Sequence, residues 1–327
     1  MSKEKKFIFA TLIQIITISV AYISISEYII RRYVLPLDSS IKAARIFKNS
    51  MSPNVIWGDS QTHEGLNNLD KFINLSFGAD SYQEINIKVK KYYSRIDDTN
   101  SKRAILLLGY NSFGENYNEI NNSLLSEIFL SDNQKPTFYF FKSYFRKRSY
   151  RYIANFFKNG FKILPSKNII FNEDGSQSIK KIHNSAKYFN NIKNEKNKFN
   201  DKNISYRLLE DLLEDSLYIK DYKESPNYNA LLKIIEYFKK EGIDTCYITT
   251  PRHKDIRKFM KRNKIYSEIS DFYKRLAIDK DLTYFNFTEV EYPSSYFSDP
   301  VHLNYLGAQE FTKLVKEKCF PYFNDLQ

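Results

Sequence analysis

The sequence predicts an α/β protein in which a short parallel sheet forms the middle layer of a three-layer α/β/α sandwich. Short apolar segments alternate with stretches of helical spacing, and several of these segments end at a glycine or a proline. An order of strand, helix and strand implies right-handed crossovers and therefore a parallel sheet. An uncharged N-terminal run and a long stretch that breaks the alternation add one transmembrane helix and a large insertion to this fold.

Length and charge limit the possible classes. The 327 residues suffice for one large α/β domain, or for a medium domain with an insertion. A net charge of +12 predicts a basic surface and an acidic or phosphate-bearing partner. The basic residues are scattered and match no nucleic-acid motif, so no nucleic-acid partner is expected. Cys246 and Cys319 fit no CxxC or metal-ligand pattern and leave the redox compartment open.

The N-terminus predicts a membrane anchor. Lysines precede an uncharged run from Phe7 to Ser26, which would span about 30 Å as a helix and so match a bilayer. No small-residue cleavage site follows before Arg31, which favours an uncleaved anchor over a signal peptide. We assign residues 1–30 to the cytoplasmic start and the anchor, and 31–53 to a juxtamembrane linker.

The sequence does not decide which way this anchor crosses the membrane. Basic residues lie on both sides of the apolar run, so the positive-inside rule does not decide. We favour an extracytoplasmic catalytic domain, because a short basic start before one apolar span resembles a signal anchor. The alternative is a buried core helix, which would have to be apolar on all faces.

The catalytic domain is predicted to begin at residues 54–115. Asn54–Trp57 is an apolar run that ends at Gly58, as expected for a buried parallel strand. Further strands are predicted at Phe72–Leu75 and Ala104–Leu108, with a helix over Tyr82–Ile96 between them.

The domain resumes over residues 226–327. Strands are predicted at Asp244–Thr250 and Leu282–Phe287, separated by a helical stretch from Lys254 to Leu276. Tyr305–Lys318 predicts a closing helix.

Residues 116–225 do not fit this rhythm and are predicted to be an insertion, because loops of this length are usually functional or disordered. Its first half interleaves aromatic and basic residues at Phe138–Lys142 and Tyr150–Tyr152, and Asn190–Asn203 is rich in Asn and Lys. One interpretation is a lid or glycan-contacting surface. The other is that the aromatics form a small helical core.

Polar residues follow several predicted strands at their carboxyl ends, where open α/β folds place their sites. Ser60 follows the first strand within Gly58-Asp59-Ser60, although Asp59 or Ser60 could instead simply cap a helix. Gly78 follows the second strand and Asn111 the third, each a candidate donor to an oxyanion. Asp299 lies three residues before His302, so its carboxylate can orient the imidazole as a base.

These four blocks, in this order, resemble the SGNH (GDSL-like) hydrolase superfamily over residues 54–115 and 240–318. The resemblance implies that Ser60 is the nucleophile, with His302 as base and Asp299 as its partner. It also implies an oxyanion hole from Gly78, the Ser60 amide and Asn111. The sequence departs from the family pattern at Gln61, where Leu is common, and at Ser112, which replaces an Asp.

Other candidate residues lie near these blocks. His63 is one turn beyond Ser60, and we consider both a pocket-lining role and an exposed helix position for it. Arg252 and His253 follow a strand and are either substrate contacts or ordinary loop residues. The sequence shows no metal-ligand spacing, and the expected mechanism needs no cofactor.

The resemblance implies acyl transfer or ester hydrolysis through an acyl-Ser60 intermediate. Membrane-anchored proteins of similar layout commonly add or remove acyl groups, often acetyl, on extracytoplasmic polysaccharides, some beside a polytopic membrane acyltransferase. A lipase or lysophospholipase that acts on acyl esters at the membrane is one alternative. A non-catalytic, membrane-tethered glycan-binding or assembly protein is another, kept open by Ser112.

Overall fold

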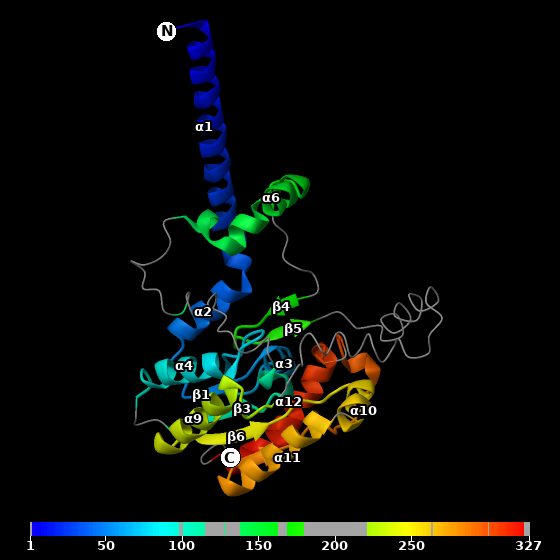
Figure 1. Ribbon diagram of the computed structural model, residues 1–327. Coiled ribbons are helices and arrows are strands. Elements are labelled where there is room, and N and C mark those ends of the chain that lie inside the picture. The colour runs from blue at the N-terminus through cyan, green and yellow to red at the C-terminus, as the bar shows by residue number, and fades with distance from the viewer. Residues whose placement is uncertain are drawn as a thin grey trace, which may run out of the picture. The chain divides into compact units, whose positions relative to one another are not determined.

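The computed structural model describes residues 2–97, 101–114, 128, 138–162, 169–179, 221–262, 264–299 and 301–323 (Figure 1). The chain divides into two compact units, of which unit 1 comprises Met1–Ala44 and Ser126–Ser166. Unit 2 comprises Arg45–Leu125 and Lys167–Gln327. All the residues predicted to form the site therefore belong to unit 2.

Unit 2 is built on a five-stranded parallel sheet with strand order β2-β1-β3-β6-β7. Its strands are β1 Asn54–Trp57, β2 Ile73–Asn74, β3 Arg103–Leu107, β6 Asp244–Ile248 and β7 Thr283–Phe285. Each coincides with a predicted strand, with small differences at the ends. Every residue of β1 and β3 is buried, which explains why these segments show no polar alternation.

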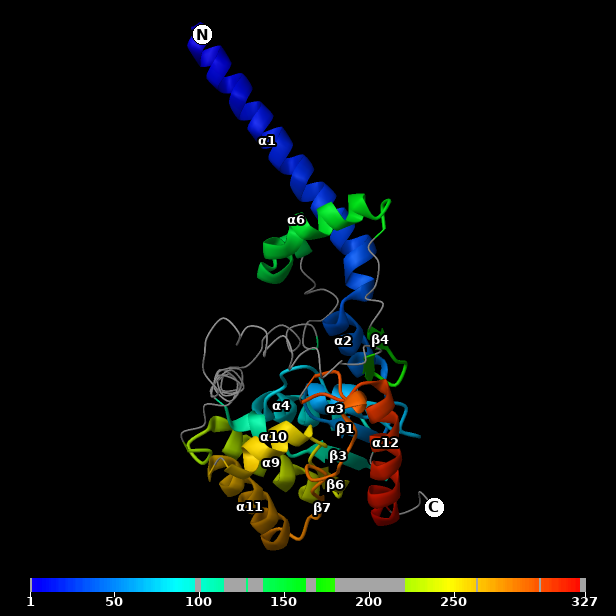
Figure 2. The ribbon, with the colours of Figure 1, turned by 90° about the vertical axis from the view of Figure 1, so that its right-hand side faces the viewer.

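Helices cover both faces of this sheet. They are α3 Ser60–Gly65, α4 Tyr82–Tyr93, α9 Pro226–Lys240, α10 Lys254–Arg262, α11 Lys264–Asp279 and α12 Tyr305–Cys319. Figure 2 shows α4, α9 and α11 on one side of the sheet and α12 on the other. The helix α4 packs against α9, and α3 packs against α12. The predicted mixed α/β fold with a parallel sheet is therefore confirmed.

The helical stretch predicted over Lys254–Leu276 is confirmed, and the structure divides it into two helices, α10 and α11. The buried residues of α10 are Ile256 and Met260, and those of α11 include Tyr266, Ile269 and Tyr273. At 100° per residue the two sets point in different directions, so one continuous helix would not bury both.

A disulfide joins Cys246 on β6 to Cys319 at the end of α12, with the two Cα atoms 5.8 Å apart. Both cysteines lie in a buried apolar cluster with Ile56 of β1 and Phe311 and Val315 of α12. The bond therefore fastens the closing helix to the central sheet. Their spacing in the sequence gave no sign of this pairing.

Unit 1 contains the long N-terminal helix α1, Lys3–Ile29. Together with the short helical turns that follow it, to Leu37, it is long and apolar enough to cross a membrane. The apolar window within this stretch is not buried by the rest of the protein, and large side chains such as Phe7 and Ile18 are exposed. The predicted linker contains a helix, α2 Ser39–Asn49.

The described parts of the predicted insertion fall into both units. In unit 1, a short turn η6, Tyr139–Phe141, and the helix α6, Ser143–Lys158, pack against α1. Tyr139 and Phe140 join a cluster with Ile29 and Ile30, so these aromatics form a small core. In unit 2, β4 Ile169–Phe171 and β5 Gln177–Ile179 form an antiparallel hairpin. The Asn-rich stretch 190–203 lies outside the described residues.

Candidate active site

The candidate nucleophile sits at the turn between β1 and α3. Gly58 permits this turn, since a Cβ there would lie 2.2 Å from Thr62 Oγ1 and 2.8 Å from Leu107 Cβ. Asp59 caps the helix, because its Oδ1 accepts a hydrogen bond from the Gln61 amide at 2.8 Å. Ser60 is therefore the first residue of α3, and its hydroxyl is not the cap.

The structure brings Ser60, His302 and Asp299 together. The Ser60 Oγ atom lies 2.8 Å from His302 Nε2, and His302 Nδ1 lies 2.7 Å from Asp299 Oδ2. The other carboxylate oxygen, Oδ1, accepts from the amides of Val301 and His302, both at 2.8 Å. With Nδ1–H donating to the carboxylate, Nε2 is left to accept the serine proton.

Charges around the imidazole set its protonation. Burial disfavours the imidazolium, but the hydrogen bond to Asp299 and the charges of Asp299, Glu64 and Asp59 raise the pKa of His302 to about 9. For Asp299, burial is outweighed by its bonds to His302 and to the amides, so its pKa is lowered. The neutral base therefore becomes the main form only at alkaline pH.

Glu64 is a neighbour that the sequence prediction missed. It lies four residues after Ser60 on α3, one helical turn along the same face. Its Oε2 atom is buried and has no hydrogen-bond partner among the described residues. Burial raises the pKa of this carboxyl to about 7, with His302 opposing and Asp299 and Asp59 adding to the shift. The i, i+4 spacing from Ser60 is the signal that could have found it.

The two predicted oxyanion donors lie after β2 and β3. Asn111 is in the turn η3, Tyr110–Phe113, and its side-chain amide makes no hydrogen bond with any residue the structure describes. The preceding Gly109 is fixed on both sides, since its N–H donates to Tyr82 Oη at 2.9 Å and its carbonyl accepts from Tyr273 Oη at 2.8 Å. The Asn111 amide is therefore free to donate from an anchored turn.

Ser112, which stands where the family pattern has an Asp, is buried. A Cβ on Gly109 would lie 2.6 Å from its Oγ, so the two residues are closely packed. Gly78 lies in the turn after β2, where no heavy atom lies within 4 Å of an added Cβ. A ligand could therefore approach its backbone. The oxyanion roles of Gly78 and Asn111 remain predictions.

Arg252 and Gln61 form a link between the two halves of the site. The Gln61 Oε1 atom accepts from Arg252 at 2.6 Å and from Thr250 Oγ1 at 2.7 Å. Arg252 also donates to the Val301 carbonyl at 3.4 Å, within the Asp299–His302 turn. Because Arg252 is only 3% exposed, these contacts favour a positioning role over direct substrate contact.

The other two candidate histidines are engaged in packing. His63 is buried, so the expected exposed helix position is wrong, and its Nε2 bonds the Gly175 carbonyl at 3.1 Å. Burial lowers the pKa of His63 to about 4, which keeps it neutral. His253 Nε2 lies 2.7 Å from Ser294 Oγ, and its ring packs edge-on against Phe297. Neither ring contacts the Ser60 hydroxyl in these bonds.

Within the described part of the chain, no group of three or more His, Cys, Asp or Glu residues is placed to hold a metal ion. A model of an uncharacterised protein family matches residues 167–324. This match includes β6, α12 and the Asp299–His302 pair but not Ser60. A search of curated proteins found no match to the chain.

Proposed function

We propose that this protein is a serine-dependent acyltransferase or esterase that works through an ester on Ser60. The observation that carries this proposal is the continuous line of hydrogen bonds from the Ser60 hydroxyl through His302 to Asp299, at 2.8 and 2.7 Å. A serine, an imidazole and a carboxylate in this order are the parts that nucleophilic acyl transfer needs.

The proposed chemistry has two steps. In the first, Ser60 Oγ attacks the carbonyl carbon of an acyl ester and its proton passes to His302 Nε2. The tetrahedral oxyanion would be stabilised by amide donors, with Asn111 and the Gly78 and Ser60 backbones as candidates. The C–O bond to the leaving alcohol then breaks, and His302 returns the proton to that oxygen.

In the second step the acceptor hydroxyl gives its proton to His302 and attacks the acyl carbon. The Ser60–acyl bond then breaks, and the serine recovers its proton from His302. Water as acceptor gives hydrolysis, and a sugar hydroxyl gives transfer.

We place this chemistry outside the cytoplasm, on a membrane-anchored protein. The long apolar α1 supports the anchor. The Cys246–Cys319 disulfide supports an oxidising compartment, since cytosolic proteins rarely keep such bonds. The proposed substrate is an acyl-bearing or acyl-accepting cell-surface polysaccharide, and a polytopic acyltransferase would be a fitting supplier of the acyl group.

Covalent labelling tests this proposal. A fluorophosphonate probe should label the detergent-solubilised protein at Ser60, and Ser60→Ala should abolish labelling and lower ester hydrolysis by about 10⁴-fold or more. Ser94→Ala, which alters the exposed serine directly after α4 and outside the site, is the control and should label fully. Folded protein that does not react, or labelling that survives Ser60→Ala, would remove Ser60 from the mechanism.

A further inference from the structure

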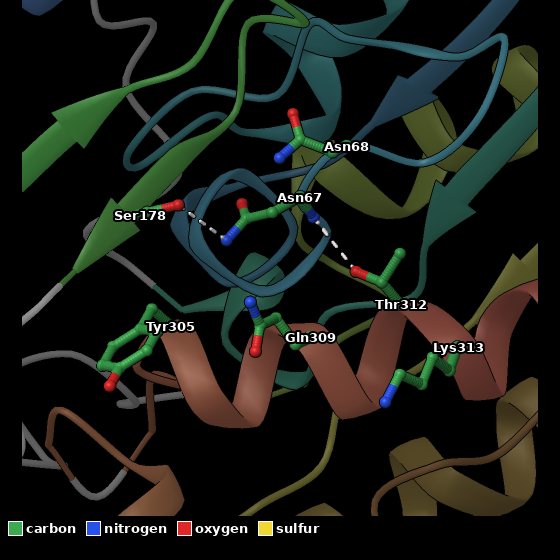
Figure 3. A pocket seen from close by; sticks show the side chains of 7 residues that line it. All are labelled: Asn67, Asn68, Ser178, Tyr305, Gln309, Thr312 and Lys313. Atoms are coloured by element: carbon green, nitrogen blue, oxygen red, sulfur yellow. Dashed lines mark hydrogen bonds between the residues drawn. The ribbon is translucent and has the colours of Figure 1, made fainter.

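An open pocket of about 850 Å³ lies between the loop after α3, strand β5 and helix α12 (Figure 3). Helix α12 supplies one wall, and the α3 loop and the hairpin strand supply the others. Its lining side chains are mostly amides and hydroxyls, from Asn67, Asn68, Ser178, Tyr305, Gln309 and Thr312.

The walls of this pocket are held in place by hydrogen bonds. The Asn67 backbone N–H donates to Thr312 Oγ1 at 3.1 Å, and the Asn67 side-chain amide donates to Ser178 Oγ at 3.1 Å. The Asn68 N–H donates to Asp174 Oδ2 at 2.7 Å. The loop is thus fastened to α12 and to the hairpin, so little ordering would be needed on binding.

Several polar groups at this pocket lack a partner. Asn67 is only 8% exposed, yet its Oδ1 atom accepts no hydrogen bond from any described residue. A buried acceptor left unpaired is costly, so a ligand donor would satisfy it. The side chains of Asn68, Tyr305 and Gln309 likewise make no hydrogen bond within the described ranges.

The chemistry of the lining selects among ligand classes. None of the described residues that line the pocket is Val, Leu, Ile, Met or Phe, which disfavours an acyl chain. Lys313, at the edge, is paired with Glu310 at 2.7 Å, so no unpaired positive charge is offered to a phosphate. What remains is one aromatic ring with an apolar face, Tyr305, among many uncharged donors and acceptors. Sugar rings have this combination of apolar faces and hydroxyls.

We propose that this pocket binds sugar units of a glycan chain. Residues that line the pocket are near the candidate triad in the sequence. Tyr305 follows His302 by three residues, and Asn67 follows the short helix that begins at Ser60. At 3.8 Å per residue, the Tyr305 and His302 Cα atoms lie within about 11 Å of each other. If the bound sugar is the acceptor of the acyl group, the pocket is an acceptor subsite, and this role rests on the proposed acyl transfer.

Direct binding tests it. Calorimetry of the detergent-solubilised protein with maltohexaose, cellohexaose and chitohexaose should detect binding of at least one. The double variant Tyr305→Ala, Gln309→Ala should bind about tenfold more weakly or worse, because two contacts are lost. Glu317→Gln, an exposed change on α12 outside the pocket, should bind as wild type. Both variants alter side chains that are not deeply buried, so their unfolding midpoints should match wild type.

No binding of any of the three sugars, or equal binding by the double variant, would overturn the sugar site. Binding that is lost in the double variant while fluorophosphonate fails to label Ser60 would support the site and refute the acyl-transfer proposal. The two ideas therefore fail separately.

A second, independent inference concerns helix α6 of unit 1, which carries three different faces. Phe145, Ser149 and Phe156 are buried. Tyr150, Ala154 and Phe157 recur four and three residues apart on a second, exposed face. The third face is also exposed and is polar and basic, with Arg148, Arg151, Asn155 and Lys158.

The buried face of α6 is fixed to the C-terminal part of α1. Ser149 Oγ lies 3.0 Å from Tyr22 Oη, and the Glu27 carboxylate accepts from the amides of Tyr139 at 3.0 Å and Phe140 at 2.8 Å. In both Figure 1 and Figure 2, α6 extends sideways from this part of α1. A helix across the end of a membrane-spanning segment lies where lipid headgroups would be.

We infer that α6 lies in the headgroup layer of the bilayer that α1 crosses. Its exposed aromatic face would enter the acyl boundary, and its basic face would meet lipid phosphates. Phe141, Phe157 and Phe161 are 56%, 55% and 63% exposed, which is unfavourable in water and expected for side chains that contact lipid.

Tryptophan quenching tests this placement, since the chain has one tryptophan, Trp57, buried in unit 2. The full chain would be reconstituted in phosphatidylcholine vesicles with and without brominated acyl chains. A tryptophan introduced by Phe157→Trp should lose at least about half of its added emission in brominated lipid. Asn155→Trp, on the polar face of the same helix, is the matched control and should be quenched much less. Absence of quenching at residue 157, or equal quenching at both positions, would overturn the inference.

Discussion

The base of the candidate triad lies among three carboxylates, and this has consequences for when it can act. Asp299 bonds the imidazole directly, while Glu64 and Asp59 act on it through their charge. Each negative charge favours the imidazolium, which cannot accept the serine proton. The rate should therefore rise with pH through a midpoint near pH 9, the pKa of His302, and level off above it as the imidazole becomes fully neutral.

Glu64→Gln should move the midpoint of the rise in kcat/KM with pH to lower pH, by up to about one unit. The reason is that the glutamate, with a pKa of about 7, is ionised in the range where His302 titrates and holds the pKa of His302 up. The measurement is kcat/KM against pH for p-nitrophenyl acetate, corrected for spontaneous hydrolysis. Glu317→Gln serves as the control for loss of a distant charge, and an unchanged midpoint in Glu64→Gln would mean that Glu64 does not act on the base.

At the residue scale, the sequence predicted the three residues of the candidate triad but not the residues that hold them in place. Ser60, Asp299 and His302, which the structure brings together, were chosen because each lies in a block that resembles the SGNH pattern and because Asp299 lies three residues before His302. Gln61 carried no such signal, since its bond to Arg252 joins residues 191 positions apart. The burial of His63 could not be predicted for a similar reason. The hairpin carbonyl that fixes it, at Gly175, lies within the predicted insertion.

At the scale of elements, hydrophobic patterning gave the sheet and failed where long-range pairing decides. The predicted parallel strands are short apolar runs, several of which end at or near a glycine or a proline, and each appears in the structure. The β4–β5 hairpin was not predicted, because each of its strands has only three residues and they pack on distant parts of the chain. The disulfide between β6 and the end of α12 was also not predicted from the sequence.

This covalent link should make a measurable difference to stability. In the double variant Cys246→Ala, Cys319→Ala, the free energy of unfolding should be about 2–5 kcal/mol lower than in the oxidised protein. The reason is that the bond joins residues 73 positions apart and so restricts the unfolded chain. Chemical denaturation in detergent, followed by circular dichroism, would measure this. Wild type treated with reductant should behave like the double variant. Equal stability of oxidised, reduced and substituted protein would show that the bond contributes nothing.

At the scale of the whole molecule, the apolar N-terminal helix and the candidate active site lie in different compact units. Unit 1 carries the apolar helix α1 and the aromatic helix α6. Unit 2 carries the sheet, the candidate triad and the disulfide. The sequence predicted the anchor from composition alone, but it did not show that residues 138–158 belong with it, because that grouping depends on contacts such as those of Glu27.

The proposed extracytoplasmic orientation of unit 2 can be tested in the cell. If α1 crosses the bilayer with its lysines inside, unit 2 lies outside the cytoplasm, and its cysteines should be oxidised in the cell. Acid trapping, denaturation and alkylation with a heavy maleimide should then leave Cys246 and Cys319 unmodified unless reductant is added first. A C-terminal alkaline phosphatase fusion should be active, and a matched fusion placed directly after Lys6 should not.

Two reactive thiols in trapped cells, together with an inactive C-terminal fusion, would place unit 2 in the cytoplasm. That result would contradict the surface-polysaccharide substrate while leaving the chemistry of Ser60 to be judged by its labelling.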